Sequence, residues 1–395
     1  MMKKIALYVA TTVFLVVATT TVILYGRGYN FNLVDGKVGI FGTGILAVTS
    51  QPNGAGVYID DHLTSATNNT INLPPGEYNV KIAKSGYSTW NKKIKIEKEV
   101  VSSVYAFLIP TAPKLDNVTE SGVGSPVLDP TRTKVAYTVS SSDDPRKNGI
   151  YILDMGLRPI LTLQSSSSQI VGNTIDNFSK ASLSWSPDAK ELVATVSAGT
   201  DATTTYLLKT TFNDNPQDIT ATLASVDSTW KTQEITQDNL QLLGFRTELQ
   251  NLIKNHFAIL SWSEDETKIL YLAGDSAILP QIIEPALIGT NSTPEERKIV
   301  KGAVYVYDIK EDRNYKILDS NSLSLSWFAD SKHLIYVADR RINIMDYDGQ
   351  NKTTIYAGPF IDNYVFSWPD ASKILILTNL DNPTILPNLY TIGLK

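Results

Sequence analysis

Side chains able to do acid–base or metal chemistry are few in this chain. It has three histidines, His62, His256 and His333, and no cysteine, so thiolate metal sites and disulfides are excluded. No Gly-x-Ser-x-Gly elbow, His-Glu-x-x-His pair or P-loop occurs. A Ser-His-Asp triad would need an arrangement that no motif announces. We therefore expect no catalytic, cofactor-binding or metal-binding residue, and a protein that is not an enzyme.

Each histidine has an ordinary structural interpretation. His62 falls at the tip of a turn with no second ligand nearby, which favours an exposed side chain. His256 ends a predicted helix, where a positive charge is favourable. His333 falls in a turn of a repeated unit. One catalytic alternative stays open, because forty acidic residues form many pairs and only geometry could select two for glycoside hydrolysis.

Two short motifs suggest binding sites but are better explained by local structure. "GTGILA" at 42–47 matches the dinucleotide fingerprint, yet the alternating, β-branched residues that follow predict a strand where that site needs a helix. "DYDGQN" at 346–351 could suggest a cation site, but it lacks the further acids of a calcium loop. A hairpin turn is the better account of this second motif.

The net charge of −5 is mild, and no run of lysine or arginine forms a basic stripe. Proteins that bind nucleic acid neutralise phosphates with such stripes, so we expect no nucleic-acid partner. The charged fraction of 19% is low, and Ser, Thr, Asn and Tyr fill the rest, which favours strands and turns. The fold class we predict is mostly β.

Residues 5–25 are uncharged and long enough, at about 1.5 Å per helical residue, to cross a membrane. Lys3 and Lys4 precede this stretch, and only Arg27 follows closely, which predicts a cytoplasmic stub at 1–4 and an outside C-terminal part. The lipid bilayer would then be a partner through residues 5–25. The alternative is a signal peptide cleaved after Ala18, giving a secreted protein. Residues 26–45 read as a juxtamembrane connector with a hairpin at Asp35-Gly36.

From 46 to 110 short alternating strands are separated by turn residues, as in a small sandwich. Tyr58, Tyr78, Tyr87 and Trp90 are expected to fill its core. The stretch "SQPNGAGVYIDD" at 50–61, followed by "LPPGEYNVKIAKSGY" at 73–87, resembles the PEGA domain. The matching residues are Pro52, Asn53, Gly54 and Ala55, then Pro75, Gly76 and Tyr78, then Gly86 and Tyr87. This resemblance implies a non-catalytic extracytoplasmic module, a spacer or a surface contact.

One pattern repeats through the remainder of the chain. Tryptophan is followed by an acid three residues later and by Leu or Ile seven residues later, at Trp185, Trp262 and Trp327 with Asp188, Asp265 and Asp330. After Trp368 the acid, Asp370, comes at two, and a weaker first copy has Leu128 in the tryptophan position. Such spacing indicates one supersecondary unit used several times, with structural turn aspartates.

The units resemble blades of TolB-type and WD40-like β-propellers over residues 113–395. Copies begin near Ser125, Ser182, Leu260, Leu325 and Phe366, which predicts five blades, with six as the alternative. We expect residues 114–120 to supply the outer strand of the last blade. Insertions near 236–257 and 276–301 lengthen the first intervals.

Both insertions are expected to contain a helix. In the first, Leu242, Phe245, Leu249, Leu252 and Ile253 recur at helical spacing. In the second, Thr293, Pro294 and Glu296 match a capping box, and the apolar run 278–288 is either a partner surface or packing over the rim.

We expect a membrane-anchored, extracytoplasmic, non-catalytic binding or scaffold protein of the cell envelope, with an envelope protein or cell-wall glycan as partner. The alternatives are a propeller-type carbohydrate-active enzyme with a central carboxylate site and a purely structural surface spacer.

Overall fold

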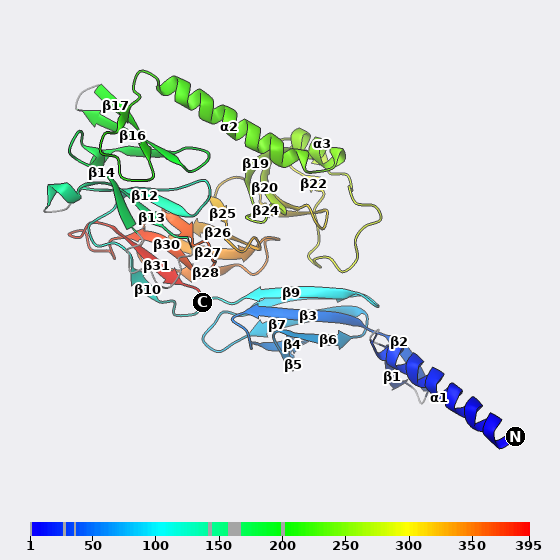
Figure 1. Cartoon of the computed structure of the whole chain (residues 1–395). Helices are drawn as coiled ribbons and strands as arrows, with labels where there is room; N and C mark the ends of the chain where they lie inside the picture. Colours follow the sequence, from blue (N-terminus) through cyan, green and yellow to red (C-terminus); the bar gives the residue numbers. More distant parts are fainter. Residues whose placement is uncertain (1, 27–28, 35–36, 141–143, 157–166, 199–201) are drawn as a thin grey trace. The chain divides into compact units, whose positions relative to one another are not determined.

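The computed structural model describes residues 2–26, 29–34, 37–140, 144–156, 167–198 and 202–395 (Figure 1). Contacts divide the chain into two units. Unit 1 comprises Met1–Thr111, Pro280–Glu296 and Ile309–Arg313, and unit 2 comprises Ala112–Leu279, Arg297–Asp308 and Asn314–Lys395. Strands dominate both units, as the composition predicts.

The N-terminal part of unit 1 is a helix followed by a hairpin. Helix α1 spans Met2–Gly26, and β1 (Tyr29–Val34) pairs antiparallel with β2 (Lys37–Gly42). This pairing confirms the hairpin expected in the connector, although its turn residues Asp35 and Gly36 lie outside the described residues. Side chains of α1 are described for residues 7–23. Among the described residues, no helix combines the length and apolarity needed to cross a membrane.

The following strands form two sheets, visible in blue and cyan in Figure 1. One sheet has the order β6-β3-β9, with β3 (Gly44–Gln51), β6 (Asn69–Leu73) and β9 (Val101–Phe107), of which β3 and β9 run parallel. The other has the order β5-β4-β7-β8, with β4 (Gly56–Ile59), β5 (His62–Ala66), β7 (Gly76–Ala83) and β8 (Trp90–Ile96). Strand β3 begins at Gly44, inside the "GTGILA" motif, so a strand and not a helix follows the dinucleotide match.

The core of this small domain is mainly aliphatic. Leu46, Val57 and Ile82 are fully buried, and Trp90 joins them. Tyr78 and Tyr87 pack against the core from its edge, whereas Tyr58 is half-buried beneath the ammonium group of Lys81. Tyrosine therefore supplies less of the core than we expected, because inward positions of β3, β4 and β7 are already filled by branched aliphatic residues.

Unit 2 contains the sequence repeats. Among its described residues, the strands form five four-stranded sheets. Sheet 1 has β11 (Gly124–Leu128), β12 (Lys134–Val139), β13 (Gly149–Asp154) and β14 (Ser167–Gly172); sheet 2 has β15 (Ser182–Trp185), β16 (Glu191–Ala198), β17 (Ala202–Lys209) and β18 (Gln217–Asp218). Sheet 3 has β19 (Phe257–Trp262), β20 (Lys268–Ala273), β23 (Val304–Asp308) and β24 (Arg313–Leu318); sheet 4 has β25 (Leu325–Trp327), β26 (His333–Ala338), β27 (Arg341–Asp346) and β28 (Thr353–Tyr356).

Sheet 5 joins the two ends of unit 2. Its order is β10 (Leu115–Asn117), β31 (Asn388–Gly393), β30 (Lys373–Thr378) and β29 (Val365–Ser367), and β10 pairs antiparallel with β31. The expectation that residues 114–120 supply the outer strand of the last repeat is confirmed. Thr119 and Asn388 reinforce the joint through buried hydrogen bonds.

The two insertions differ from what the sequence predicts. The first contains two helices, α2 (Leu223–Leu243) and α3 (Thr247–His256), where we expected one starting near residue 237. Leu242, Leu249, Leu252 and Ile253 are buried as predicted. The second insertion has no helix at residues 293–297, so the predicted capping box is wrong. This stretch instead follows an extended path that leads to β22 (Lys298–Ile299). Strand β22 pairs with β21 (Ala277–Ile278).

Candidate functional site

The same hairpin turn occurs once in each of the five sheets of unit 2. It joins β11 to β12, β15 to β16, β19 to β20, β25 to β26 and β29 to β30. A backbone hydrogen bond closes each turn, as from Ala189 N–H to the Ser186 carbonyl, and the donor residue has a positive φ. The donors are Arg132, Ala189, Glu266, Ser331 and Ala371. In each turn an aspartate accepts a hydrogen bond from a nearby backbone N–H, as Asp188 does from Lys190 at 3.2 Å. The same holds for Asp129, Asp265, Asp330 and Asp370, so the structural role predicted for the turn aspartates is confirmed.

Strand register corrects the alignment of the last repeat. Trp185, Trp262 and Trp327 pair with Leu192, Ile269 and Leu334, and Leu128 pairs with Val135 as predicted for the weak first copy. In sheet 5 the residue that pairs with Ile374 is Ser367. Ser367 therefore occupies the tryptophan position, and Trp368 is already the first residue of the turn. This shift explains why Asp370 follows Trp368 after two residues.

The tryptophans join neighbouring sheets. The Trp185 indole donates to the Val127 carbonyl of sheet 1 at 3.0 Å, and the Trp327 indole donates to the Ser261 carbonyl of sheet 3 at 3.3 Å. Ser367, which replaces tryptophan in sheet 5, accepts a bond from Ala329 N–H of sheet 4 at 3.0 Å. The repeated position therefore carries contacts between sheets.

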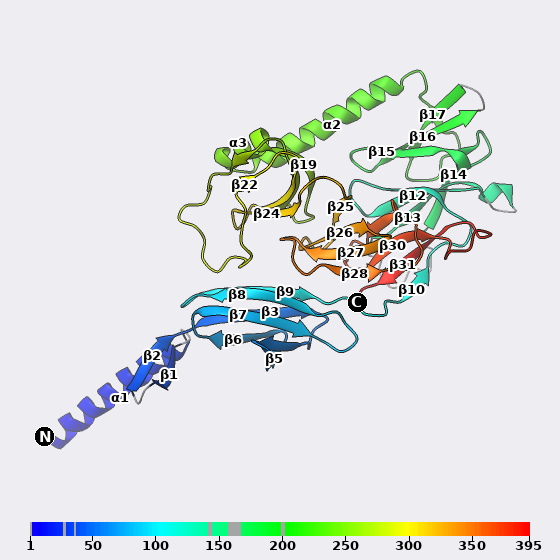
Figure 2. The same cartoon turned by 180° about the vertical axis from the view of Figure 1, so that it is seen from behind.

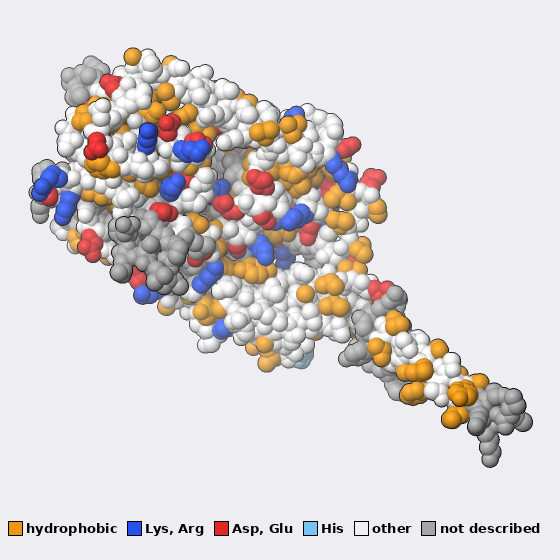
Figure 3. All heavy atoms as spheres, viewed as in Figure 1, with side chains coloured by type: hydrophobic (Ala, Val, Ile, Leu, Met, Phe, Trp, Pro, Cys, Tyr) orange, Lys and Arg blue, Asp and Glu red, His pale blue; other side chains and the backbone are white. Residues whose placement is uncertain are grey.

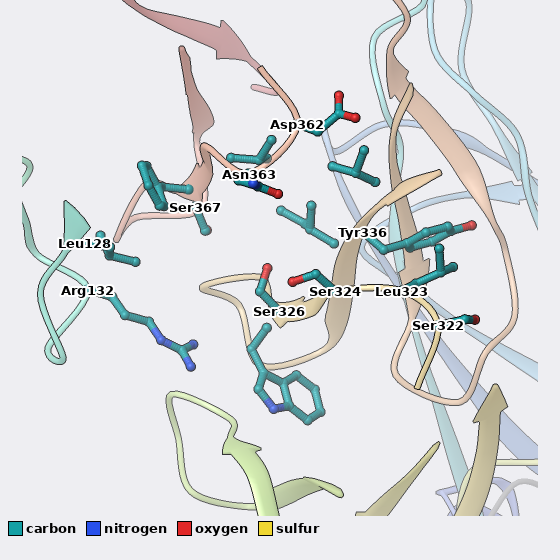
Figure 4. A pocket seen from close by; sticks show the side chains of 15 residues that line it. Leu128, Arg132, Ser322, Leu323, Ser324, Ser326, Tyr336, Asp362, Asn363 and Ser367 are labelled. Atoms are coloured by element: carbon teal, nitrogen blue, oxygen red, sulfur yellow. The ribbon is translucent and has the colours of Figure 1, made fainter. Parts of the chain in front are cut away.

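A cavity of about 650 Å³ lies beside β25 of sheet 4 and β29 of sheet 5 (Figure 4). Ser322, Ser324 and Ser326 line the cavity; Ser326 lies on β25, and Ser322 and Ser324 lie in the segment that leads into this strand. Asn363, Val365 and Ser367 line the opposite side. Tyr336 and Phe366 add aromatic surface, and Leu323 and Ile335 add aliphatic surface.

Arg132 reaches the cavity from the turn of sheet 1 (Figure 4). Its guanidinium group donates to the carboxylate of Glu264 in the turn of sheet 3 at 3.0 Å. This ion pair occupies part of the guanidinium group and fixes its position. The remaining N–H groups of Arg132 are the cationic donors nearest to a bound molecule.

The lining of the cavity is mostly neutral. Asp362 is the one carboxylate among the described residues that line the cavity. Glycoside hydrolysis commonly uses two facing carboxylates, so this lining does not offer the pair that the enzyme alternative requires. Within the described ranges, no group of three or more His, Cys, Asp or Glu residues is placed to hold a metal ion. The serine and asparagine side chains of the cavity can donate and accept hydrogen bonds without carrying charge, and its aromatic rings can pack against an apolar face of a bound molecule.

Each histidine lies outside this cavity. His62 is exposed on β5, as predicted. His256 ends α3, where its Nδ1 lies 2.9 Å from the Asp275 carboxylate. His333 is buried, with Nδ1 2.6 Å from Asp330 and Nε2 3.3 Å from Asp346. The "DYDGQN" motif that contains Asp346 forms the turn between β27 and β28, as expected.

The His333 cluster is a buried charge pair with a strongly shifted titration. Burial by itself lowers the pKa of His333, but the carboxylates of Asp330 and Asp346 outweigh it and raise this pKa to about 10. Burial by itself raises the pKa of Asp330, and His333 overcomes that effect and holds the pKa below its usual value. His333 and Asp346 are cross-strand partners at the positions that Lys268 and Asp308 occupy in sheet 3. The cluster is therefore a variant of a repeated structural pair.

Sequence reasoning missed the cavity residues. The alternation of serine in "SNSLSLSW" at 320–327 was the available signal, since it places polar groups on one face of a strand that precedes a repeat turn.

Residues 43–111 match the family model of the PEGA domain. This part of the chain is a PEGA domain. The match agrees with the resemblance carried by residues 50–61 and 73–87, and with the two-layered fold of unit 1. No curated protein matches the chain.

Solved propeller proteins are similar to the chain at low identity. A TolB structure from Agrobacterium tumefaciens is 12% identical, with 68% of this chain and 78% of that chain covered and a TM-score of 0.23. The β-propeller domain of the Trilobed protease from Pyrococcus furiosus is 13% identical, with 89% and 95% covered and a TM-score of 0.24. Acylaminoacyl peptidase from Pyrococcus horikoshii is 10% identical, with 67% and 37% covered and a TM-score of 0.19. At such identities and TM-scores, these likenesses do not indicate what this chain binds or does.

Proposed function

We propose that this chain is a membrane-anchored, extracytoplasmic, non-catalytic binding protein whose cavity in unit 2 holds a neutral cell-wall glycan. The cavity lining carries this proposal. Its serine and asparagine groups suit the hydroxyl groups of a sugar, and Tyr336 and Phe366 suit the apolar face of a sugar ring. Asp362 and Arg132 are the ionised groups at its wall, so a neutral ligand fits better than a strongly charged one.

The five sheets are proposed to be five blades of one ring. Buried clusters join sheets 1 and 2, sheets 1 and 5, and sheets 3 and 4, and the Ala329–Ser367 bond joins sheets 4 and 5. These contacts set the order 2–1–5–4–3. A ring then needs only one more step, between sheets 3 and 2, which α2 and α3 connect along the chain.

The anchor is proposed to be residues 5–25, with an N-in topology. Exposed apolar side chains extend along α1 from Leu7 to Ile23 (Figure 3). Threonines at 11, 12, 19, 20 and 21 donate their hydroxyl groups to carbonyl oxygens four residues earlier, which lowers the cost of placing them in lipid. On the face drawn in Figure 3, the surface beyond α1 mixes acidic and basic side chains, which supports an aqueous environment for this part of the chain.

Binding can be tested with the full chain in nanodiscs and purified cell-wall glycan. Ser324→Phe fills the cavity, and Ser182→Phe is a matched control, because both serines are exposed and lie three residues before a repeat tryptophan. We expect wild type and Ser182→Phe to bind glycan and Ser324→Phe to lose most of that binding, with both variants folded by circular dichroism.

Three other results would contradict the glycan proposal. Equal binding by both variants would place the glycan elsewhere, and binding of solubilised envelope protein but not glycan would favour a protein partner. Release of new reducing ends from the glycan by wild type would favour the enzyme alternative.

Topology can be tested independently, because the chain has no cysteine. Single-cysteine variants Met2→Cys and Ser228→Cys place a thiol at the first residue of α1 and on the exposed surface of α2. In intact cells a membrane-impermeant maleimide should label Ser228→Cys but not Met2→Cys. The reverse pattern would overturn the topology, and a membrane-free product lacking α1 would favour a cleaved signal peptide.

A further inference from the structure

Strand β8 is the edge of its four-stranded sheet in the PEGA domain (Figure 2). An edge strand presents unpaired backbone groups that can accept another chain. Here the outward N–H of Lys95 donates to Ser292 Oγ at 3.0 Å. Ser292 comes from the second insertion, 197 residues further along the chain, and belongs to unit 1. We call residues 280–296, which pass this edge, the clasp.

The clasp also contacts the PEGA domain at Gly289, beside the connection between β8 and β9. Its φ is +70°, and a Cβ there would lie 2.6 Å from Val100 Cγ1 and 2.9 Å from the Val101 carbonyl oxygen. Only glycine fits this backbone and this contact without displacement. The N–H of Gly289 also donates to Glu97, whose carboxylate is paired with Lys95 at 2.8 Å.

Two acids hold the irregular backbone of the clasp in place. Asp312 accepts hydrogen bonds from the N–H groups of Ile282 and Ile283 at 2.6 and 2.8 Å, and Glu311 accepts one from Asn291 at 2.9 Å. Both acids lie in Ile309–Arg313, which is also part of unit 1. The clasp is thus preformed by backbone contacts, and a cavity of about 210 Å³ remains between it, Lys95, Glu97 and Arg313.

We propose that the β8 edge of the PEGA domain, together with its connection to β9, is a docking surface for a hydroxyl- and amide-rich peptide segment, and that the clasp is its built-in occupant. The fit rests on main-chain geometry, on Gly289 against Val101 and on the hydroxyl of Ser292, so few side-chain contacts define it. Small hydrophilic residues, Thr290, Asn291, Ser292 and Thr293, follow the glycine. The PEGA domain then serves as an intramolecular receptor and not only as a spacer. This inference does not depend on the glycan proposal.

The first test compares two glycines in the full chain. Gly289→Ala adds a Cβ against Val100 and Val101, whereas Gly302→Ala adds a Cβ with nothing within 4 Å, and both positions have positive φ. The two variants therefore share the backbone strain and differ in the contact. Hydrogen exchange should become about tenfold faster or more in residues 286–296 and at Lys95 in Gly289→Ala only.

The second test supplies the clasp as a separate peptide with the sequence of residues 286–295, "ALIGTNSTPE". We expect this peptide to bind Gly289→Ala and to protect Lys95 from exchange, but not to bind wild type, whose edge is occupied. A peptide carrying Ser292→Ala should bind more weakly, because it cannot accept from Lys95.

Three outcomes would overturn the proposal. Equal exchange in the two glycine variants would mean that the clasp does not depend on the Gly289 contact. An opened Gly289→Ala variant that ignores the peptide would mean that the edge is not a receptor. Equal peptide binding by wild type would mean that the clasp does not occupy the site.

Discussion

The indole Nε1 of Trp327 donates a hydrogen bond to the carbonyl oxygen of Ser261, which lies in the neighbouring sheet just before that sheet's own tryptophan. Trp185 makes the same bond to Val127, which precedes Leu128 at the equivalent position of sheet 1. The repeated tryptophan therefore ties sheets 2 and 4 to the same point on the first repeat strand of sheets 1 and 3. Its ring fills the interface while its N–H satisfies a carbonyl group that β pairing leaves free.

Replacing Trp327 by phenylalanine should destabilise unit 2. The change removes the bond to Ser261 and leaves a gap at a side chain that is 1% exposed, for a combined loss of roughly 2 kcal/mol in the free energy of unfolding. Trp368→Phe is the matched control, since Trp368 is half-buried in a turn beneath Lys373 and should cost less than about 1 kcal/mol. Denaturant unfolding of the full chain in micelles can be followed by tryptophan fluorescence, because Trp90 is the one tryptophan outside unit 2. Equal losses in both variants would contradict the role assigned to the repeat position.

The His333 cluster predicts how stability depends on pH. The pKa of His333 is raised from its ordinary value of 6.5 to about 10, so between these pH values the folded state binds a proton that the unfolded chain releases. The stabilisation is complete below pH 6.5 and is lost as the pH rises to about 10. The lowered pKa of Asp330 has the opposite effect on stability. The stabilisation that it provides is lost as the pH falls through the acid range. His333→Gln should therefore be less stable at pH 6 and should lose much of the wild-type decline between pH 6 and pH 10.

Urea unfolding at pH 6, 8 and 10 checks this expectation. His62→Gln is the control for removing a histidine from an exposed position. A His333→Gln variant that declines as steeply as wild type above pH 6.5 would show that other groups produce the pH dependence.

The turn aspartates should matter in proportion to the N–H groups that they satisfy. Asp129 is 2% exposed and accepts from Thr133 N–H at 2.8 Å and Lys134 N–H at 2.6 Å. Asp129→Ala leaves both N–H groups without this acceptor and should cost about 2 kcal/mol or more, whereas Asp129→Asn keeps an oxygen that can accept from both, as Oδ1 does, and should cost about half as much. Thermal unfolding at a fixed pH compares the two variants. An alanine variant as stable as the asparagine variant would mean that water replaces the carboxylate.

Local chemistry made much of the fold predictable. The five hairpin turns are predictable because their Asp and Pro residues interact with the backbone only a few residues away. The outer strand of the last sheet is predictable because the chain ends one strand short of a full repeat after Phe366. The register of the last repeat was not predictable in this way. Aligning the repeats on tryptophan selects Trp368, whereas the position of the turn at Asp370 makes Ser367 the residue that pairs with Ile374. Helix α2 was missed at its start because residues 223–236 lack an apolar period; most of them are exposed.

Long-range contacts explain the remaining differences. Thr293, Pro294 and Glu296 have helix-starting chemistry, but Ser292 binds Lys95 and Asn291 binds Glu311, and these contacts hold the chain extended. The cavity walls come from two strands about forty residues apart, so no local pattern pairs Ser326 with Ser367.

The joint between the two ends of unit 2 gives the last prediction. Asn388 is 8% exposed, and its Oδ1 accepts from Thr119 Oγ1 at 3.1 Å and from Gly122 N–H at 3.0 Å. Thr119 Oγ1 in turn accepts from Leu389 N–H at 2.9 Å. Asn388→Ala removes the shared acceptor and should cost roughly 2 kcal/mol, because two buried donors lose their partner.

Asn382→Ala is a matched control in the loop before β31, where the side chain accepts local bonds from Thr384 at the surface. If unit 2 is a ring held at this joint, Asn388→Ala should lower the midpoint of a single cooperative transition, since opening the joint exposes the edges of β10 and β31. Urea unfolding followed by fluorescence and by far-ultraviolet circular dichroism checks whether both probes shift together. A variant in which the midpoint stays at that of Asn382→Ala, or in which sheet 5 unfolds separately from the others, would contradict a ring whose stability depends on joining its ends.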